Sequence, residues 1–383
     1  MESSLAETQA LRVAVVTPDW PSSADGRSSL ADVLARGVRA CGSSVEVWTP
    51  DPRSRKAAAT TGPTARVRTL SGPRWRKWGR THWKKGASEF LGQFKPDLVV
   101  ATDWRPIHGV QDAIEALPVA ERPKVAGFAG TELEEAVSAA VRAERKEALQ
   151  SGVPWLAFAD RSKRLLARGG VPPDRVFSVH PAVIGPATPP DRTLRQRPRR
   201  LLSVAPLVAS AGQDVMIEAL ARLHPDHPHL KYEVVGEGPD GSRLRGLAES
   251  VGVGDRVVFR GRLDATTLEH TYARADLFVL PGRRPANAEL EPDYTTLFLE
   301  AASRGVPVLG SGGSAGAAGL EDDVTGRVLE RPSDVSAVAD AVHELLRFPL
   351  GLVRLARAGR LRFESSGRPA HLGARLLELA ADW

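Results

Sequence analysis

The chain has 383 residues, enough for two ordinary domains, and its 42% hydrophobic and 26% charged residues are typical of a soluble globular protein. No apolar run approaches the roughly 20 residues that span a bilayer, and the N-terminus lacks the basic and apolar regions of a signal peptide. The single cysteine, Cys41, excludes an internal disulfide and a multi-cysteine metal site. We therefore expect a cytoplasmic protein. Its net charge of +6 favours anionic partners without choosing among nucleotides, membranes and nucleic acid.

In the N-terminal half, apolar runs of strand length alternate with helical patterns. The first strand is predicted at 11–16, followed by a helix at 28–41 and a strand at 45–48. Further strands are predicted, with helical segments between most of them, at 97–100, 125–128, 155–158 and 176–179. Repeated strand–helix units indicate a parallel sheet covered by helices on both faces.

Residues 71–85 hold six basic residues, three tryptophans and no acidic residue. Wound as a helix after Pro73, the segment places Trp75, Trp78 and His82 on one side and most of its charges on the other. This pattern is typical of an interfacial helix that lies on anionic lipid. It is equally the pattern of a domain helix that buries its tryptophans and exposes its charges. Nucleic acid is not expected as a partner, because no recognised binding module is present.

The alternation of strands and helices restarts after a stretch at 185–200 that is rich in Pro and Arg, which we interpret as a linker. The strands predicted beyond it lie at 201–204, 232–235, 257–260, 277–280, 307–310 and 327–329. The whole pattern predicts an α/β protein of two doubly wound, Rossmann-like domains that face each other across a cleft. Ligands of such sheets bind at the carboxyl ends of the strands, so the cleft is the expected site.

The run at 291–308 is the most informative feature of the chain. It predicts an acidic loop, a short amphipathic helix that contains Glu300, a glycine turn and a buried strand. A carboxylate on that helix, next to a loop of backbone N–H groups, can hold sugar and ribose hydroxyls. The turn at Gly236 and Gly238 is not a P-loop, since no Gly-Lys-Ser/Thr follows. These two glycines either line the same site or only provide turn geometry.

Several segments of the C-terminal half resemble family-4 glycosyltransferases of the GT-B fold. They are Gly212-Gln-Asp-Val-Met-Ile-Glu-Ala-Leu, Val234-Val-Gly-Glu-Gly-Pro239, Val258-Phe-Arg-Gly261, Tyr272-Ala-Arg-Ala-Asp-Leu-Phe-Val-Leu-Pro281, Leu299-Glu-Ala and Gly305-Val-Pro-Val308. The N-terminal half is similar more loosely, at Lys95-Pro-Asp-Leu-Val-Val100 and Gly170-Val-Pro-Pro-Asp-Arg-Val176. The resemblance covers nearly the whole chain. It implies transfer of a sugar from a nucleoside diphosphate to an acceptor with retention of configuration, and no bound metal or other cofactor.

The resemblance also implies roles for residues of the donor site. Glu300 matches the family's second glutamate and would bind the donor ribose. The first glutamate, eight positions earlier, is replaced by Pro292, so a one-residue insertion in the loop would bring Glu291 to the catalytic position. Three amide groups would face the phosphate or the sugar, and otherwise they only begin the helix with Thr295 as its N-cap. They belong to Tyr294, Thr295 and Thr296.

The phosphate-binding positions depart from the family. The Arg and Lys that usually neutralise the diphosphate correspond to Pro206 and Ala211. A diphosphate without such partners loses charge-assisted hydrogen bonds worth roughly 1.5–3 kcal/mol each. Arg283 and Arg284 lie in the loop before Glu291 and are candidate substitutes; the alternative is a solvated basic loop.

The N-terminal half departs from the family as well. The position of its usual cleft histidine corresponds to Ala129, and a Gly-Gly pair of the first loop is replaced at 22–26. Thr102-Asp-Trp104 resembles the His-Asp-Trp of glycogen and starch synthases with Thr in place of His. His108 is a candidate catalytic substitute; otherwise it is a structural histidine near a helix start. His180 has the same two interpretations.

We therefore predict a retaining glycosyltransferase with an acceptor-binding domain at 1–188, a donor-binding domain at 189–366 and a terminal helix at 367–383 that crosses back to the first domain. Its expected partners are a nucleotide sugar, an acceptor that the sequence does not identify, and the inner face of an anionic membrane contacted through residues 71–85. The alternative is a catalytically degenerate GT-B protein that serves as a binding or partner subunit. The missing cationic pair, histidine and Gly-Gly loop favour that alternative, whereas Glu300 and its surroundings favour the enzyme.

Overall fold

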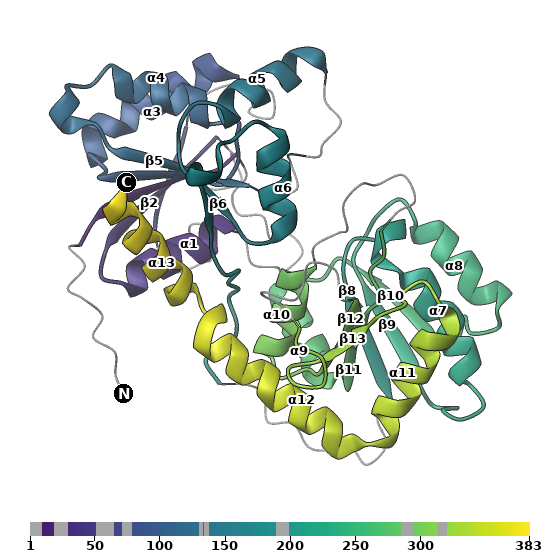
Figure 1. The fold of residues 1–383 in the computed structure, drawn as a ribbon. Helices are drawn as coiled ribbons and strands as arrows, with labels where there is room; N and C mark the ends of the chain where they lie inside the picture. The colour runs from purple at the N-terminus through teal and green to yellow at the C-terminus, as the bar shows by residue number, and fades with distance from the viewer. Residues whose placement is uncertain are drawn as a thin grey trace. The chain divides into compact units, whose positions relative to one another are not determined.

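The computed structural model describes residues 10–18, 30–50, 65–70, 79–129, 133, 138–188, 199–284, 294–311 and 320–383. The chain divides into two compact units (Figure 1). Unit 1 runs to His180 and also contains Pro369–Trp383, whereas unit 2 spans Pro181–Arg368. Each unit holds one sheet of parallel strands covered by helices, so the predicted α/β architecture of two doubly wound domains is confirmed.

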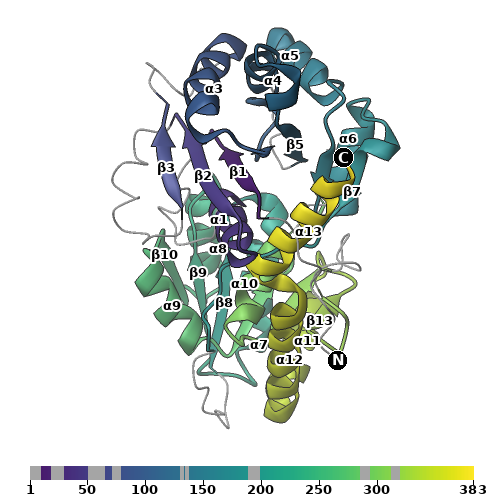
Figure 2. The same ribbon diagram turned by 90° about the vertical axis from the view of Figure 1, so that its left-hand side faces the viewer.

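The sheet of unit 1 has the strand order β3-β2-β1-β4-β5-β6-β7, and its neighbouring strands pair in parallel. The strands are β1 (Arg12–Val16), β2 (Ser44–Thr49), β3 (Arg66–Thr69), β4 (Leu98–Ala101), β5 (Lys124–Ala129), β6 (Trp155–Ala157) and β7 (Val176–Ser178). Six of these strands were predicted within one or two residues. The sequence did not predict β3, which lies at the sheet edge beside β2 (Figure 2).

The helices of unit 1 pack on this sheet through apolar faces. They are α1 (Leu30–Ala40), α3 (Arg80–Phe94), α4 (Ile107–Glu115), α5 (Ala139–Leu149), α6 (Asp160–Arg168) and α13 (Pro369–Asp382). Trp83 and Phe90 of α3 join Trp48 of β2 in one core cluster. The terminal helix α13 packs on α1 at a glycine contact, where a Cβ on Gly37 or Gly373 would collide with the backbone of the other helix. The end of α13 is held as well, because Lys124 Nζ donates to the Ala380 carbonyl at 2.6 Å.

The sheet of unit 2 has the strand order β10-β9-β8-β11-β12-β13, again with parallel pairing. Its strands are β8 (Arg200–Val204), β9 (Lys231–Val235), β10 (Val257–Gly261), β11 (Leu277–Leu280), β12 (Val308–Ser311) and β13 (Arg327–Leu329). Its helices are α7 (Gln213–Leu223), α8 (Gly241–Ser250), α9 (Ala265–Arg274), α10 (Thr295–Ser303), α11 (Val335–Arg347) and α12 (Pro349–Arg362). All six strands were predicted within one residue at each end.

Alternate residues of each unit 2 strand face opposite layers of helices, as the two-residue period of a strand requires. Leu201 and Val279 belong to the core cluster that contains α7, α8 and α11. Leu202 and Phe278 belong to the cluster on the other face, which contains α9 and α10. Both faces of the sheet are buried, which is why its strands appear in the sequence as unbroken apolar runs.

The expected linker at 185–200 is only partly a linker, and this is a correction. Its first residues are fixed to unit 2, because Gly185 packs against Ser303 and Phe363. The buried guanidinium of Arg360 donates to the carbonyls of Pro186 at 3.1 Å and Ala187 at 2.9 Å. Pro and Arg content carries no information about hydrogen bonds from a helix more than 170 residues later.

Candidate functional site

The strand order of unit 2 reverses between β8 and β11, and doubly wound sheets bind their ligands at such a point, beyond the carboxyl ends of the strands. The loops that follow β8 and β11 lead into the N-termini of α7 and α10. The positive ends of two helix dipoles therefore lie at this edge of the sheet, where they favour an anion. We call this edge of unit 2 the switch-point site.

The two loops of the switch-point site are bonded to each other. The Arg283 amide donates to the Ser210 carbonyl at 2.8 Å, and the Tyr294 hydroxyl donates to Ser210 Oγ at 3.0 Å. Gly212 begins α7 with a φ of 74°, and a Cβ there would collide with the Pro281 carbonyl. Only glycine suits both the left-handed backbone and this close approach. The described ends of the second loop, at Arg283 and Tyr294, are thus both tied to Ser210 of the first.

Gly236 and Gly238 let a third loop, between β9 and α8, pack against the first. A Cβ on Gly236 would collide with the Ala205 carbonyl, and one on Gly238 with the Leu207 carbonyl. Turn geometry therefore requires both glycines, and their contact with a donor stays a prediction. A hollow of about 30 Å³ opens between these loops and β10. Its lining residues are Val204, Ala205, Pro206, Val235, Gly236, Glu237, Arg262 and Leu263.

Arg283 is present at the switch-point site, but its guanidinium already forms an ion pair. Its guanidinium lies 2.6 Å from Oδ2 of Asp214 on the first turn of α7, and Arg243 lies 3.2 Å from the same oxygen. Burial alone would raise the pKa of Asp214, but the hydrogen bond and charge of Arg283, the Val215 amide and Arg243 together outweigh it, so the pKa is lowered. Asp214 is therefore a carboxylate paired with two arginines, and Arg283 as a diphosphate ligand stays a prediction. Arg284, in contrast, is exposed.

Sequence reasoning missed the role of Asp214, although the residue stands in the Gly212-Gln-Asp segment. A signal was available, because an acidic residue on the first turn of a helix is favoured by the helix dipole and attracts cations from nearby loops. The partner could not be identified, since Arg283 lies 69 residues away in the sequence. The two family positions for cations hold Ala211, which is fully buried, and Pro206, which lines the hollow.

Glu300 lies on the second turn of α10 and is 3% exposed. The helix is buried over almost its whole length, and the Glu300 side chain is buried with it. Arg304, one turn later, donates to the Glu300 carbonyl at 3.0 Å and is itself held by Glu269 at 2.9 Å. Whether Glu300 contacts a ribose is not tested by this geometry and stays a prediction.

The expected start of α10 was wrong by one residue. Tyr294, and not Thr295, is the N-cap, and it makes no side-chain capping bond. The Tyr294 ring is instead placed over Gly282, and its backbone carbonyl accepts from the amides of Leu297 at 2.9 Å and Phe298 at 3.1 Å. Packing of the ring thus decides where the helix begins. Thr295 is buried and Thr296 exposed. Glu291 lies outside the described residues, as do Pro292 and the residues at 22–26.

In unit 1, His108 lies on the first turn of α4, which follows the carboxyl end of β4. Its ring sits between helices: Nε2 is buried and lies 3.9 Å from Glu147 Oε2 of α5. Burial first, and then the charge of Arg80, lower the pKa of His108 against the opposing effect of Glu147 and Asp112. The catalytic role of His108 stays a prediction.

Other candidate positions of unit 1 lie in or near its core. Trp104 is buried in the cluster around β5 and β6, and Asp103 is held next to it, with its Oδ1 accepting from the Arg105 amide at 2.8 Å. Ala129 is the buried last residue of β5, and His180 is exposed just after β7. No histidine therefore stands at the end of β5, where the family usually has one.

The basic segment at 71–85 is described only from Gly79 onward, so Trp75 and Trp78 lie outside the described residues. In the described part, α3 begins at Arg80, whose guanidinium lies 2.7 Å from Asp112. Trp83 is 1% exposed in the core of unit 1. For Trp83, burial agrees with a domain helix and not with a helix that lies on lipid.

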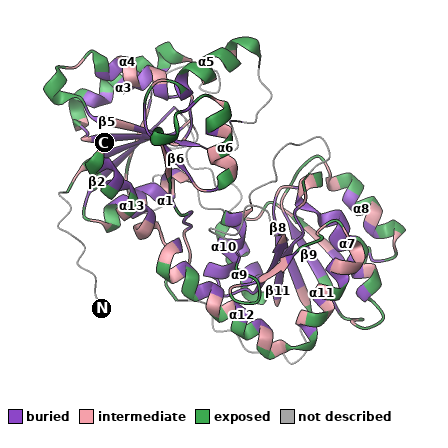
Figure 3. Ribbon diagram, viewed as in Figure 1, coloured by how far each residue is buried: buried purple, intermediate pink, exposed green. Residues whose placement is uncertain are grey.

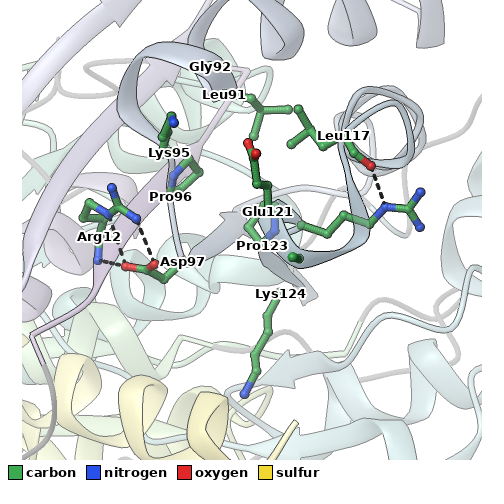
Figure 4. A pocket seen from close by; sticks show the side chains of 12 residues that line it. Arg12, Leu91, Gly92, Lys95, Pro96, Asp97, Leu117, Glu121, Pro123 and Lys124 are labelled. Carbon is green, nitrogen blue, oxygen red and sulfur yellow. Dashed lines mark hydrogen bonds and ion pairs between the residues drawn. The ribbon is translucent and has the colours of Figure 1, made fainter.

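A larger hollow, of about 320 Å³, lies in unit 1 at the edge where the strands of its sheet begin (Figure 4). Its walls come from the amino ends of β1, β4 and β5, away from the edge where doubly wound sheets bind ligands. Its cations are largely engaged: Arg12 lies 3.2 Å from Asp97, and Arg122 donates to the Leu117 carbonyl at 3.1 Å. We assign no substrate to it.

The described residues contain no group of three or more His, Cys, Asp or Glu that could hold a metal ion. None of the helices they form is both long and apolar enough to cross a bilayer.

Comparison with known proteins agrees with the fold. Residues 187–362 match the family described as Glycosyl transferases group 1. The chain is similar to sucrose-phosphate synthase from Thermosynechococcus elongatus, with a TM-score of 0.72 and 18% identity over 97% of this chain and 98% of that one. It is also similar to Anabaena HepE, solved in complex with UDP, with a TM-score of 0.70 and 14% identity over 97% and 100% of the two chains.

Curated relatives match over shorter stretches. One is the GDP-mannose-dependent monoacylated alpha-(1-6)-phosphatidylinositol monomannoside mannosyltransferase of Corynebacterium glutamicum, 31% identical over 51% of this chain and 52% of that protein. Another is the GDP-mannose-dependent alpha-(1-6)-phosphatidylinositol monomannoside mannosyltransferase of Mycolicibacterium smegmatis, 34% identical over 50% and 52%. The chain thus spans about half the length of the curated relatives it matches. The solved structures show that the protein has the GT-B fold, and residues 187–362 of unit 2 match the glycosyl transferases group 1 family.

Proposed function

We propose that this protein is a retaining glycosyltransferase that uses a nucleoside-diphosphate sugar as donor, with the donor bound at the switch-point site of unit 2. The observation that carries the proposal is the combination, at one sheet edge, of the N-termini of α7 and α10 with the buried carboxylate of Glu300. Helix N-termini stabilise phosphate, and a carboxylate accepts hydrogen bonds from ribose hydroxyls. The family match over residues 187–362 supports the same assignment.

The donor's diphosphate leaves as an anion, so its charge must be balanced as the glycosidic bond breaks. We assign this task to the two helix N-termini together with Arg283 and Arg284, and we expect no metal ion to be needed. The pairing of Arg283 with Asp214 means that the donor must compete for this cation. The amides of Tyr294, Thr295 and Thr296 would contribute at the start of α10. Catalytic roles for Glu291 and His108 remain part of the proposal.

The curated relatives are named for GDP-mannose and for acceptors built on phosphatidylinositol. We therefore propose GDP-mannose as the first donor to test, and a lipid-linked polyol or sugar as the acceptor class. Such an acceptor would bring the protein to an anionic membrane from its cytoplasmic face, and the segment at 71–85 remains one candidate for that contact.

A catalytically degenerate binding subunit is the second candidate. One observation favours it: in the described residues of the loops after β8 and β11, Arg283 is paired with Asp214, which leaves Arg284 to replace the family's Arg and Lys. Such a protein would bind nucleotide weakly or not at all.

Thermal unfolding with a panel of nucleotide sugars separates these candidates. A ligand that binds only the folded state at ~100 times its dissociation constant adds roughly 2.7 kcal/mol of stability, which is readily detected. We expect stabilisation by one donor, with slow release of its nucleoside diphosphate that a chelator does not abolish. Lack of stabilisation by any donor in the panel would favour the degenerate subunit.

The matched variants are Glu300→Gln and Glu218→Gln. The second replaces an exposed glutamate of α7 in the same unit. Glu300→Gln should abolish most of the stabilisation, because an amide accepts hydrogen bonds from hydroxyls without the strength that a charge gives them. Glu218→Gln should behave like the parent. Equal donor binding by the two variants would remove Glu300 from the proposed site.

A further inference from the structure

Exposed apolar side chains of this protein are concentrated on one helix. Among the described residues, six large hydrophobic side chains are exposed, and four of them lie between residues 348 and 361. They are Phe348 at 61%, Leu350 at 77%, Val353 at 41% and Leu361 at 55% exposed. A fifth, Val324 at 44%, lies in the loop whose Asp323 carbonyl accepts from Arg354 of the same helix at 2.6 Å. A cluster of this kind marks a surface that contacts something less polar than water.

The cluster forms one face of α12. Its opposite face packs on unit 2 through buried residues that include Leu352 and Leu355. At 100° per residue, Leu350, Val353 and Leu361 point outward within one third of a turn of each other, so they form a continuous stripe along the helix. Figure 3 shows exposed segments along α12 at the border of unit 2. The stripe is therefore a feature of the folded helix and not a frayed end.

The same segment is strongly basic. Residues 347–362 contain five arginines and no acidic residue; four of the arginines are exposed, whereas Arg360 is buried and paired with Glu364. Arg357 lies within the apolar stripe, and Arg347 and Arg362 are exposed at the two ends of the segment. Asp323, beside Arg354, does not cancel this charge, because its carboxylate is paired with Arg327 at 2.7 Å. The α12 surface, defined here as the exposed side chains of residues 347–362, thus combines apolar anchors with uncompensated positive charge.

We propose that the α12 surface binds an anionic lipid bilayer. A helix that lies in the bilayer interface buries its Leu and Phe side chains among the acyl chains, while arginines reach the phosphates on their long aliphatic stems. The charge supports the same occupant, since basic residues near an anionic membrane are attracted within about a Debye length of its surface. A ridge of this kind fits a deformable lipid surface without needing a complementary groove.

A second copy of the chain is a poorer occupant. A symmetric dimer through this surface would place two α12 helices against each other, with the same residues on both sides. Eight exposed arginines would then meet with no acidic partner from residues 347–362, and the like charges would repel. In an anionic bilayer, by contrast, the lipid phosphates balance the charges of the arginines.

Sedimentation with lipid vesicles tests the proposal. The full chain is spun with vesicles of phosphatidylcholine alone and with vesicles that also contain phosphatidylglycerol. We expect it to bind only the anionic vesicles, and less as salt rises. The double variant Phe348→Ser with Leu350→Ser should lower the partition coefficient by roughly tenfold or more, because each buried apolar side chain contributes to insertion. The charge reversals Arg357→Glu and Arg362→Glu should lower it further.

The matched controls lie in unit 1. Val119→Ser removes an apolar side chain that is 78% exposed outside the α12 surface. Arg142→Glu with Lys146→Glu reverses two exposed charges of α5. Both controls should bind vesicles like the parent, and all variants should keep the parent's unfolding temperature, since the changed side chains are exposed.

Three results would overturn the proposal. The parent could fail to bind anionic vesicles. The α12 variants could bind them as well as the parent, which would move the contact to another segment such as 71–85. The parent could instead form a dimer that the Phe348→Ser and Leu350→Ser variant loses, without binding vesicles, which would make the surface a protein interface.

Discussion

The guanidinium of Arg283 lies 2.6 Å from the carboxylate of Asp214, and this ion pair joins the loop after β11 to the first turn of α7. It brings a cation to the switch-point site and neutralises it at the same time. In the proposed function, a nucleoside diphosphate would compete with Asp214 for Arg283. If Arg283 leaves Asp214 to bind the ligand, it replaces one of the two cations that the family usually has here. If it stays paired with Asp214, it does not.

Replacing Asp214 with Asn should strengthen binding of a nucleoside diphosphate. The variant keeps the size of the side chain but releases Arg283, whose charge then acts on the ligand. We expect an affinity gain of roughly threefold to tenfold, about 1 kcal/mol, for the diphosphate, and little change for the free nucleoside. Titration calorimetry with both ligands measures the difference. A folded Asp214→Asn variant with unchanged or weaker diphosphate affinity would show that Arg283 is not a phosphate ligand.

Gly212→Ala should destabilise unit 2. The new Cβ would collide with the Pro281 carbonyl, and the φ of 74° is unfavourable for alanine. The strain alone costs about 1–3 kcal/mol. The matched control is Gly246→Ala on α8, where an added Cβ meets nothing within 4 Å. That change should stabilise the protein by roughly 0.5–1 kcal/mol. Chemical denaturation of the two variants should therefore give shifts of opposite sign, and equal shifts would contradict the close approach of the loops.

The stability of unit 2 should depend on pH through His227. Its Nε2 lies 3.0 Å from Nδ1 of His343 on α11. Burial first, and then the charge of His343, lower the pKa of His227, although Asp226 opposes them. The unfolded chain, with a pKa of about 6.5, takes up the proton more readily than the folded one. The stabilising contribution is therefore present above about pH 6.5 and is lost as the pH falls towards the folded pKa.

Unfolding temperatures at pH 7.5 and 5.5 check this prediction. His227→Gln should show a smaller drop between the two pH values than the parent, while the exposed His229→Gln should match the parent. An identical pH dependence in all three proteins would mean that the His227–His343 contact does not influence folding.

The sequence predicted the fold well because the strands of both sheets are buried on both faces and appear as apolar runs. The exception, β3, is an edge strand whose Arg68 lies 2.6 Å from Glu46 of β2. Its four residues, Arg66–Thr69, include two arginines, so the strand carries no apolar run. The local sequence pattern was sufficient to predict strands that are buried on both faces. It was not sufficient to predict an edge strand with charged side chains.

The candidate site was less predictable than the fold. Glu300 and the glycines could be found from their order along the chain. The engagement of Arg283 by Asp214, and the placement of the Tyr294 ring over Gly282, join residues that no local periodicity relates. Such contacts are set by the packing of loops against one another, and a single sequence does not record them.

Glycosyl transfer is tested most directly by measuring the release of nucleoside diphosphate from GDP-mannose and other nucleotide sugars, with the parent, Glu300→Gln and Glu218→Gln compared side by side. We expect the parent and Glu218→Gln to release the diphosphate from one donor at equal rates, and Glu300→Gln to be at least about tenfold slower, since a charge-assisted hydrogen bond contributes roughly 1.5–3 kcal/mol. A parent protein that neither binds nor turns over any nucleotide sugar would contradict the proposed function and leave the degenerate GT-B subunit as the conclusion.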